Sequence, residues 1–292
     1  MKKSAVLFAI LAGACWGSSG MLFRFLAGTF TQMEVVFIKM VVSALLFAAV
    51  ILAKDPKMFC FKLKDAWLFL LGGLISMLLF NYCYFTAMLH TTVAVAAALL
   101  YTGPGFVVLI SALLFKEKIT KQKIVALLVL FSGCACAAGV FSGEQLITLI
   151  GVAFGITAGL CYGLYSIFTR LAMEKGYAGF TFAFYVIAVS AVGALPFVDF
   201  GHFVPALGDA NLLLCFAVAL MNCFLPYLLF TKALATLLPG DAAMLATSEP
   251  VIAAMLSVFV LGESITASVI LGICLIVVGI LIVNGGVKKK TE

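Results

Sequence analysis

Residues 33–53 read MEVVFIKMVVSALLFAAVILA, an apolar run in which Glu34 and Lys39 are the only charged residues. A helix of about 20 apolar residues crosses the hydrocarbon core of a bilayer. The run does not alternate apolar and polar residues, as a membrane-spanning β-strand does. It therefore predicts a transmembrane α-helix.

The whole chain shares this character. Its 292 residues are 65% hydrophobic and only 10% charged, with a mean hydropathy of +1.26. A soluble domain needs about a quarter of its residues charged to cover its surface, so lipid must cover much of this chain. The net charge of +6 does not indicate a nucleic-acid partner, because the basic residues lie at the ends of apolar runs without interleaved aromatic residues.

Ten such segments follow one another, and they predict an all-α membrane protein with ten transmembrane helices. Segments three and four almost fuse around His90, but their joint length is too great for one crossing. The segments are Ser4–Phe25, Met33–Ala53, Ala66–Leu89, Thr91–Phe115, Lys123–Val140, Leu146–Ala172, Ala178–Val198, Asn211–Leu234, Leu238–Leu261 and Ala267–Val287.

The basic residues indicate how these helices are oriented. If the loops are assigned alternately to the two sides, all of the 18 lysines and arginines except Arg24 and Lys39 fall on the side that holds the N-terminus. Cytoplasmic loops carry the excess of basic residues. We therefore expect both termini in the cytoplasm, in a bacterial inner membrane.

The chain also repeats itself with an offset of half its length. Pro104 coincides with Pro250, and Gly13 with Gly159, at a shift of 146 residues, and further matches run along the whole chain. We expect two units, residues 1–141 and 146–288, with five helices each. Because five is odd, the second unit enters the membrane from the opposite side. Such inverted repeats are typical of secondary transporters, whose substrate site lies near the midplane.

Three features occur in both units. They are an early Gly-x-x-x-Gly with an aromatic residue (Trp16, Tyr162), a mid-helix proline (Pro104, Pro250), and the motifs Lys116-Glu117-Lys118-Ile119-Thr120 and Gly262-Glu263-Ser264-Ile265-Thr266. In these features the chain resembles the EamA family of the drug/metabolite transporter superfamily. Lys116 departs from the glycine that is usual in the family. The resemblance implies a ten-helix carrier of small organic molecules, without a cofactor or a nucleotide-binding domain.

The common catalytic motifs are absent from the sequence. It holds no Walker motif, no His-Glu-x-x-His and no Gly-x-Ser-x-Gly. We therefore do not expect an enzyme or an ATP-driven pump. An ion gradient, or the gradient of the substrate itself, is the expected energy source.

Glu249 is the main candidate for a binding residue. It lies about eleven residues, or roughly 16 Å, into its helix, which is near the midplane. A carboxyl group at this depth is costly unless it faces a cavity or a partner. Pro250 follows it and deprives the carbonyl of Ala246 of its helical donor, and Pro104 marks the equivalent point in the first unit. We predict kinked helices with Pro104 and Pro250 as hinges, where Glu249 binds a proton, a cation or a substrate amine. The alternatives are fixed kinks and a protonated Glu249 that donates a hydrogen bond to another helix.

Lys39 lies about six residues, or roughly 9 Å, below the outer edge of its helix. Its four-carbon stem lets the ammonium reach the headgroups, and we favour this snorkelling position, or a structural pair. The alternative is that Lys39 binds a substrate carboxylate.

The remaining candidates are aromatic or polar residues within the helices. Aromatic faces attract organic cations, although each such residue also serves as packing in a membrane core. With Glu249 and Lys39, the predicted substrate-binding residues are Trp16, Ser19, Asn81, Tyr84, Tyr101, Tyr162, Tyr165, Asn222 and Tyr227.

These residues together predict a secondary transporter of a small amino acid or amine, with export favoured and a proton as the coupling ion. An importer of an organic cation is the alternative within the same class. A membrane enzyme would need a second carboxylate at the depth of Glu249, and a receptor or scaffold has no need of a midplane acid.

Overall fold

The computed structural model describes the chain except for residues 1, 27, 92, 138–147, 262–266 and 290–292. The described residues form α-helices joined by short turns, and they contain no β-strand. The predicted all-α fold is therefore confirmed.

The helices divide into those before and those after residues 138–147. The first group is α1 (Lys2–Gly17), α2 (Ser19–Leu26), α3 (Gln32–Lys54), α4 (Ala66–Gly73), α5 (Phe80–His90), α6 (Val93–Leu100), α7 (Gly103–Leu114) and α8 (Lys121–Ala137). The second is α9 (Leu149–Glu174), α10 (Gly179–Ala194), α11 (Phe200–Ala206), α12 (Asp209–Ala219), α13 (Leu225–Leu234), α14 (Pro239–Leu245), α15 (Glu249–Leu261) and α16 (Ala267–Lys289). The π-helical segment η3 (Leu74–Leu79) joins α4 to α5, and η5 (Leu220–Phe224) joins α12 to α13.

Seven helical stretches of the described chain are long and apolar enough to cross a membrane. A further apolar helix, Lys3–Gly17, is shorter. The chain is thus a multi-pass membrane protein, and the count of ten crossings stays a prediction. The stretches are Gln32–Lys54, Leu63–His90, Val95–Leu114, Leu149–Glu174, Gly179–Phe197, Asn211–Leu234 and Ala267–Gly286.

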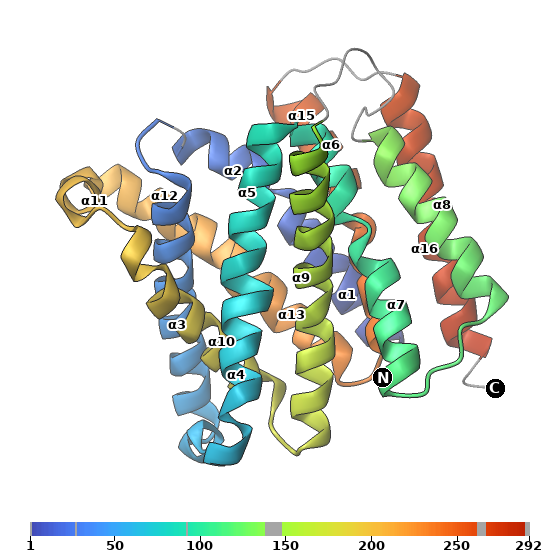
Figure 1. The fold of residues 1–292 in the computed structure, drawn as a ribbon, viewed down its shortest axis with the longest axis horizontal. Coiled ribbons are helices and arrows are strands. Elements are labelled where there is room, and N and C mark those ends of the chain that lie inside the picture. Colours follow the sequence, from blue (N-terminus) through green and yellow to red (C-terminus); the bar gives the residue numbers. More distant parts are fainter. Residues whose placement is uncertain (1, 27, 92, 138–147, 262–266, 290–292) are drawn as a thin grey trace.

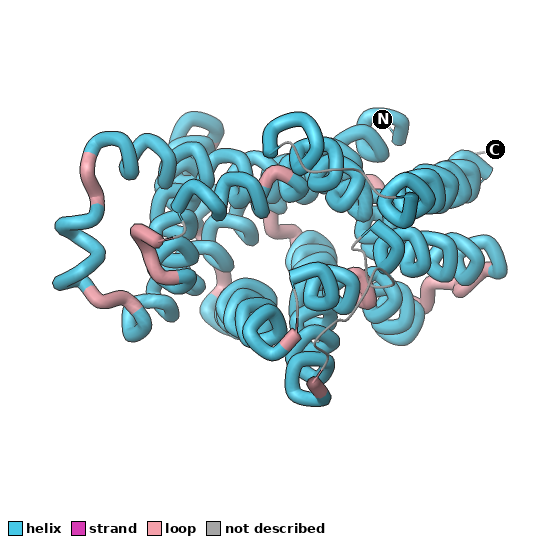
Figure 2. The backbone as a smooth tube through the Cα atoms, turned by 90° about the horizontal axis from the view of Figure 1, so that it is seen from above, coloured by secondary structure: helices cyan, strands magenta, loops and turns pink. Residues whose placement is uncertain are grey.

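Most of the long helices lie roughly along one common axis, up or down it, so the molecule has two ends (Figure 1). Figure 2 looks along this direction and shows several helices nearly end-on. The N- and C-termini lie at the same end, which we call the terminal end, and α2, α6 and α15 lie towards the opposite, far end (Figure 1).

The main helix contacts join the two groups to each other. The helix α8 packs on α16, α3 on α10, α5 on α9, and α1 on α13. The first and third of these pairs can be followed side by side in Figure 1. Each pair combines a helix from before residue 138 with one from after residue 147.

Glycines allow the closest of these approaches. A Cβ atom on Gly155, Gly159 or Gly163 of α9 would lie 2.6, 2.5 and 2.8 Å from side-chain atoms of the neighbouring α6–α7 segment. These distances are shorter than real Cβ contacts, so larger residues would push the helices apart. The glycines spaced four residues apart are therefore explained by helix packing.

Three of the predicted transmembrane segments are interrupted part-way. The chain leaves α6 at Leu100 and enters α7 at Gly103, and it leaves α14 at Leu245 and enters α15 at Glu249 through a 3-10 turn. Pro104 and Pro250 are the second residues of the new helices, where the missing N–H costs little. The predicted breaks are thus present. A third break, between Gly17 and Ser19, and the two π-helical segments were not predicted.

Candidate functional site

A cavity of about 750 Å³ lies where these interruptions meet. It is bordered by α1, α2, α3, α5, α6, α9, α15 and the η5–α13 segment. All of the predicted binding residues except Tyr165 line it: Trp16, Ser19, Lys39, Asn81, Tyr84, Tyr101, Tyr162, Asn222, Tyr227 and Glu249.

Glu249 is the first residue of α15 and borders the cavity. Its backbone N–H donates to the carbonyl of Ala246, which Pro250 cannot serve. Among the described residues, no hydrogen bond or ion pair holds its carboxyl group. The alternative prediction, a donor to another helix, therefore finds no acceptor in the described chain. The carboxyl group is left for a ligand or a proton.

Lys39 does not snorkel towards the outer edge of its helix. Its ammonium Nζ lies 3.1 Å from Oδ1 of Asn81, and both residues line the cavity. The amide Nδ2 of Asn81 donates to the carbonyl of Met77 at 2.6 Å, in the π-helical segment η3. Because the amide nitrogen is held in this way, the amide oxygen faces Lys39. Of the two positions that we favoured, the structure therefore shows the structural pair, with Asn81 on a neighbouring helix, and not the snorkelling position.

Asn222 brings a second amide to the cavity, from the other π-helical segment. Its Oδ1 atom lies 3.3 Å from the hydroxyl of Ser18 and 3.1 Å from that of Ser19, at the break between α1 and α2. Asn222 is 6% exposed, and its Nδ2 is buried without a hydrogen-bond partner in the described structure. A polar group of a ligand could accept from this amide.

The aromatic residues form one connected wall. The ring of Trp16 meets Tyr162 and Tyr227 edge-on, with centroids 5.8 and 5.3 Å apart. Tyr165 lies behind this wall. Its ring centroid is 4.7 Å from that of Tyr227, and its hydroxyl lies 3.1 Å from that of Thr231. Tyr165 therefore supports the wall but does not line the cavity.

The cavity opens at the far end and is closed towards the terminal end. Gly28, Thr31 and Gln32, in and beside the α2–α3 connection, line it and are exposed. Below it, α1 packs tightly on the broken helix of Glu249. A Cβ atom on Gly13 would clash with the carbonyl oxygen of Ala246, and the hydroxyl of Ser248 donates to the carbonyl of Ile10 at 2.8 Å.

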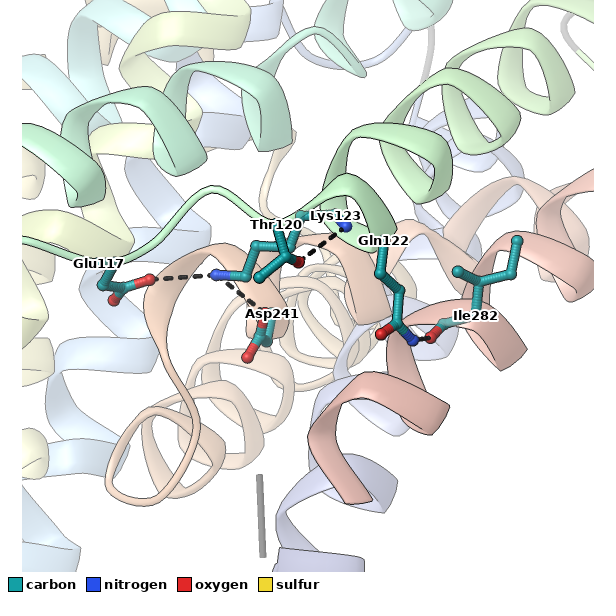
Figure 3. A network of polar contacts seen from close by, with 6 residues as sticks. All are labelled: Glu117, Thr120, Gln122, Lys123, Asp241 and Ile282. Carbon is teal, nitrogen blue, oxygen red and sulfur yellow. Dashed lines mark hydrogen bonds and ion pairs between the residues drawn. The ribbon is translucent and has the colours of Figure 1, made fainter. Parts of the chain in front are cut away.

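An ion cluster lies near the start of α8, towards the terminal end of the molecule (Figure 1), and Figure 3 shows it from close by. The ammonium of Lys123 is 3.2 Å from Oε2 of Glu117 and 3.1 Å from Oδ1 of Asp241. All three side chains are at most 8% exposed. Close by, Nε2 of Gln122 donates to the carbonyl of Ile282 at 2.6 Å. The ion pair of Lys123 with Asp241 ties α8 to α14, and the hydrogen bond of Gln122 with Ile282 ties α8 to α16.

This cluster was not predicted from the sequence. Glu117 and Thr120 belong to the motif Lys116-Glu117-Lys118-Ile119-Thr120, and the hydroxyl of Thr120 accepts the backbone N–H of Lys123 near the start of α8. Glu117 itself pairs with Lys123. Asp241 was the available signal, since it is an acid three residues into the apolar segment 238–261. The equivalent Glu263 and Thr266 lie outside the described residues.

The comparisons with known proteins agree among themselves. The model of the EamA-like transporter family matches residues 3–139 and, a second time, residues 149–285. An uncharacterized transporter of Clostridium kluyveri is 23% identical, covering 99% of this chain and 96% of its own. The pseudopaline exporter CntI of Pseudomonas aeruginosa is 27% identical over 74% of each chain. A solved crystal structure of a protein that is 17% identical superposes with a TM-score of 0.82 over the whole length of both chains, which shows a shared fold.

Proposed function

The chain belongs to the EamA-like transporter family, and on this premise we propose that it exports a small zwitterion, such as an amino acid, by alternating access. Family membership already establishes a membrane transporter with a small-molecule substrate, and it excludes an enzyme. The substrate, the direction and the mechanism are what we add.

The observation that carries the substrate proposal is the pair of opposite charges in one cavity. The carboxyl group of Glu249, which has no partner in the described structure, suits a substrate ammonium. The ammonium of Lys39, held by Asn81 at 3.1 Å, suits a substrate carboxylate. Ion pairs are strong in a low-dielectric site, so a zwitterion satisfies both groups, whereas a substrate with several negative charges is repelled by Glu249. The wall of Trp16, Tyr162 and Tyr227 covers the rest of the molecule.

The two-repeat architecture is supported by several independent relations. The family model matches twice, over 3–139 and 149–285. The π-helical segments begin at Leu74 and Leu220, which are 146 positions apart, and α7 and α15 begin at Gly103 and Glu249, with the same offset. The helix pairs between the two groups are those that a two-fold relation would give. We therefore retain ten helices in two inverted units, 1–141 and 146–288.

The open end of the cavity is compatible with export, the direction that we propose. With both termini in the cytoplasm, the far end faces outwards, and the cavity is open for release to the outside. The relative from Pseudomonas aeruginosa that is named as an exporter supports the same direction. Proton coupling follows if a proton replaces the substrate on Glu249 for the return step. The alternative, import of an organic cation, would use the same Glu249 and the aromatic wall but would not need Lys39.

Competition for transport in proteoliposomes tests the substrate class. Amino acids should compete, whereas neutral sugars and dicarboxylates should not, because neither satisfies both charges. The decarboxylated amines should bind more weakly than the parent amino acids. Undiminished binding of a sugar or a dicarboxylate by the Glu249→Gln variant would refute the proposal, and amines that bind better than amino acids would favour the importer of cations.

Cysteine labelling tests the orientation. In a cysteine-free background, a cysteine at the exposed Gly201, or at Gly143 (which lies outside the described residues), should react with an impermeant reagent added to intact cells. A cysteine at the exposed Lys57, at the terminal end, should react only after permeabilisation. Labelling of Gly201→Cys only after permeabilisation would reverse the topology and, with it, the proposed direction.

A further inference from the structure

The lining of the cavity changes from charged to apolar along its depth, and the apolar part faces the uncharged part of the proposed substrate. The charged residues Lys39 and Glu249 and the amide of Asn81 lie in its lower part, towards the terminal end. Above them, towards the far end, we define an apolar collar of six lining residues: Val35, Phe85, Met88, Ala97, Ala253 and Leu256.

Helix periodicity fixes this order of layers. Residues three, four or seven apart lie on the same face of a helix. On α3, Val35 lies four residues before Lys39, on the side of the far end. On α15, Ala253 and Leu256 lie four and seven residues beyond Glu249. Each helix therefore places an apolar side chain directly above its charged one.

The other two walls repeat the pattern. On α5, Phe85 and Met88 lie four and seven residues beyond Asn81, again towards the far end. On the α6 side, Ala97 lies four residues before Tyr101. Seven residues of helix rise about 10 Å, so the collar extends about that far above the charges. The polar residues Thr31 and Gln32 lie beyond the collar, at the opening of the cavity.

We propose that the substrate is an amphipathic zwitterion, whose charged head lies between Glu249 and Lys39 and whose apolar side chain lies in the collar. This inference rests on the proposed function and deepens it. A polar side chain would lose its water in the collar without finding hydrogen-bond partners, which is costly. An apolar side chain gains from the same transfer.

The affinity of unbranched amino acids of increasing length tests this proposal. Glycine, alanine, norvaline and norleucine share one head group, and each added methylene should tighten binding to the wild-type protein about fourfold. Glutamine, with a polar side chain of similar length, should bind at least about tenfold more weakly than norleucine. Equal affinities along the series would overturn the collar and leave the zwitterion proposal standing. Failure of every member to bind would overturn both.

A substitution that fills the collar provides a second test, which compares the affinities for norleucine and alanine and has a matched control variant. The Ala253→Phe substitution places a ring in the collar, so it should lower the ratio of norleucine to alanine affinity by at least about tenfold. Met255, on the same helix, is 46% exposed and is not among the cavity-lining residues. The Met255→Phe variant adds a ring of the same size and should keep the wild-type ratio. An unchanged ratio in a folded Ala253→Phe protein would show that side chains do not enter the collar.

Discussion

The Glu249→Gln variant should bind the substrate roughly 10- to 100-fold more weakly than the wild-type protein, and its binding should not depend on pH. Glutamine keeps the shape of the side chain but loses its charge, and a hydrogen bond to a charged group contributes about 1.5–3 kcal/mol. In the wild-type protein, binding should weaken as the pH falls, because a proton then competes with the substrate ammonium for the carboxylate. Substrate titrations at several pH values measure both effects.

A neutral residue at this position should not harm folding. The Glu249 carboxyl group has no partner in the described structure, so no ion pair is broken, and the melting temperature should stay close to the wild-type value. The Glu174→Gln variant is the matched control, since this glutamate is exposed at the terminal end and pairs with Arg170. It should keep the wild-type affinity and pH profile. If Glu249→Gln kept the wild-type pH profile too, Glu249 would be neither the proton site nor the partner of the substrate amine.

The sequence predicted the fold class and the polar and aromatic residues at the centre of the cavity lining, for a physical reason. A carboxyl group within an apolar helix cannot face lipid at low cost, so Glu249 had to face a cavity or a partner. Residues such as Trp16 and Asn222 were found by the same reasoning, because polar and aromatic groups within membrane helices gather where lipid does not reach. Tyr165 satisfied the same criteria and yet lies one layer behind the wall, since its hydroxyl meets Thr231.

What the sequence did not predict depends on contacts between distant segments. Whether Lys39 snorkels or turns inward is decided by Asn81, 42 residues away, and Asn81 is oriented by a carbonyl of a π-helical segment. A π-helical segment has no simple sequence signal of its own. The ion cluster of Lys123 likewise needs Asp241, from a helix more than a hundred residues later in the chain.

This cluster is where we expect the second large effect. A transporter that works by alternating access must open its terminal end to load the cavity from that side. The contact of Lys123 with Asp241 joins the two groups of helices at that end, with Glu117 as the second partner of Lys123, while the cavity is open at the other end. A buried ion pair contributes little net stability, because the cost of removing its charges from water offsets their attraction. Such a pair suits a gate. When the gate opens, the charges lose their mutual attraction, but their hydration by water compensates for that loss.

The Lys123→Met variant should therefore shift the protein towards the state open at the terminal end. Removing one partner of a buried pair costs about 3–5 kcal/mol. This cost falls on the state that is closed at the terminal end, in which the carboxylate of Glu117 is buried. The ratio of the two states should change by about a hundredfold or more. A reporter cysteine at Ser19, which lines the cavity, should then react with an impermeant reagent from the terminal side, whereas with Lys123 present it reacts from the far side.

Two further variants separate gating from damage to the fold. Lys121 is exposed and precedes Lys123 by two residues, so Lys121→Met should leave the labelling on the far side. In the combined variant Lys123→Met, Glu117→Gln, Asp241→Asn, all three charges are removed. The reporter should then return to reaction from the far side, because Glu117 no longer leaves a buried carboxylate without its lysine. Substrate should protect the reporter in every folded variant. If Lys123→Met is labelled only from the far side, as in the wild-type protein, the cluster is a structural contact and the gate lies elsewhere.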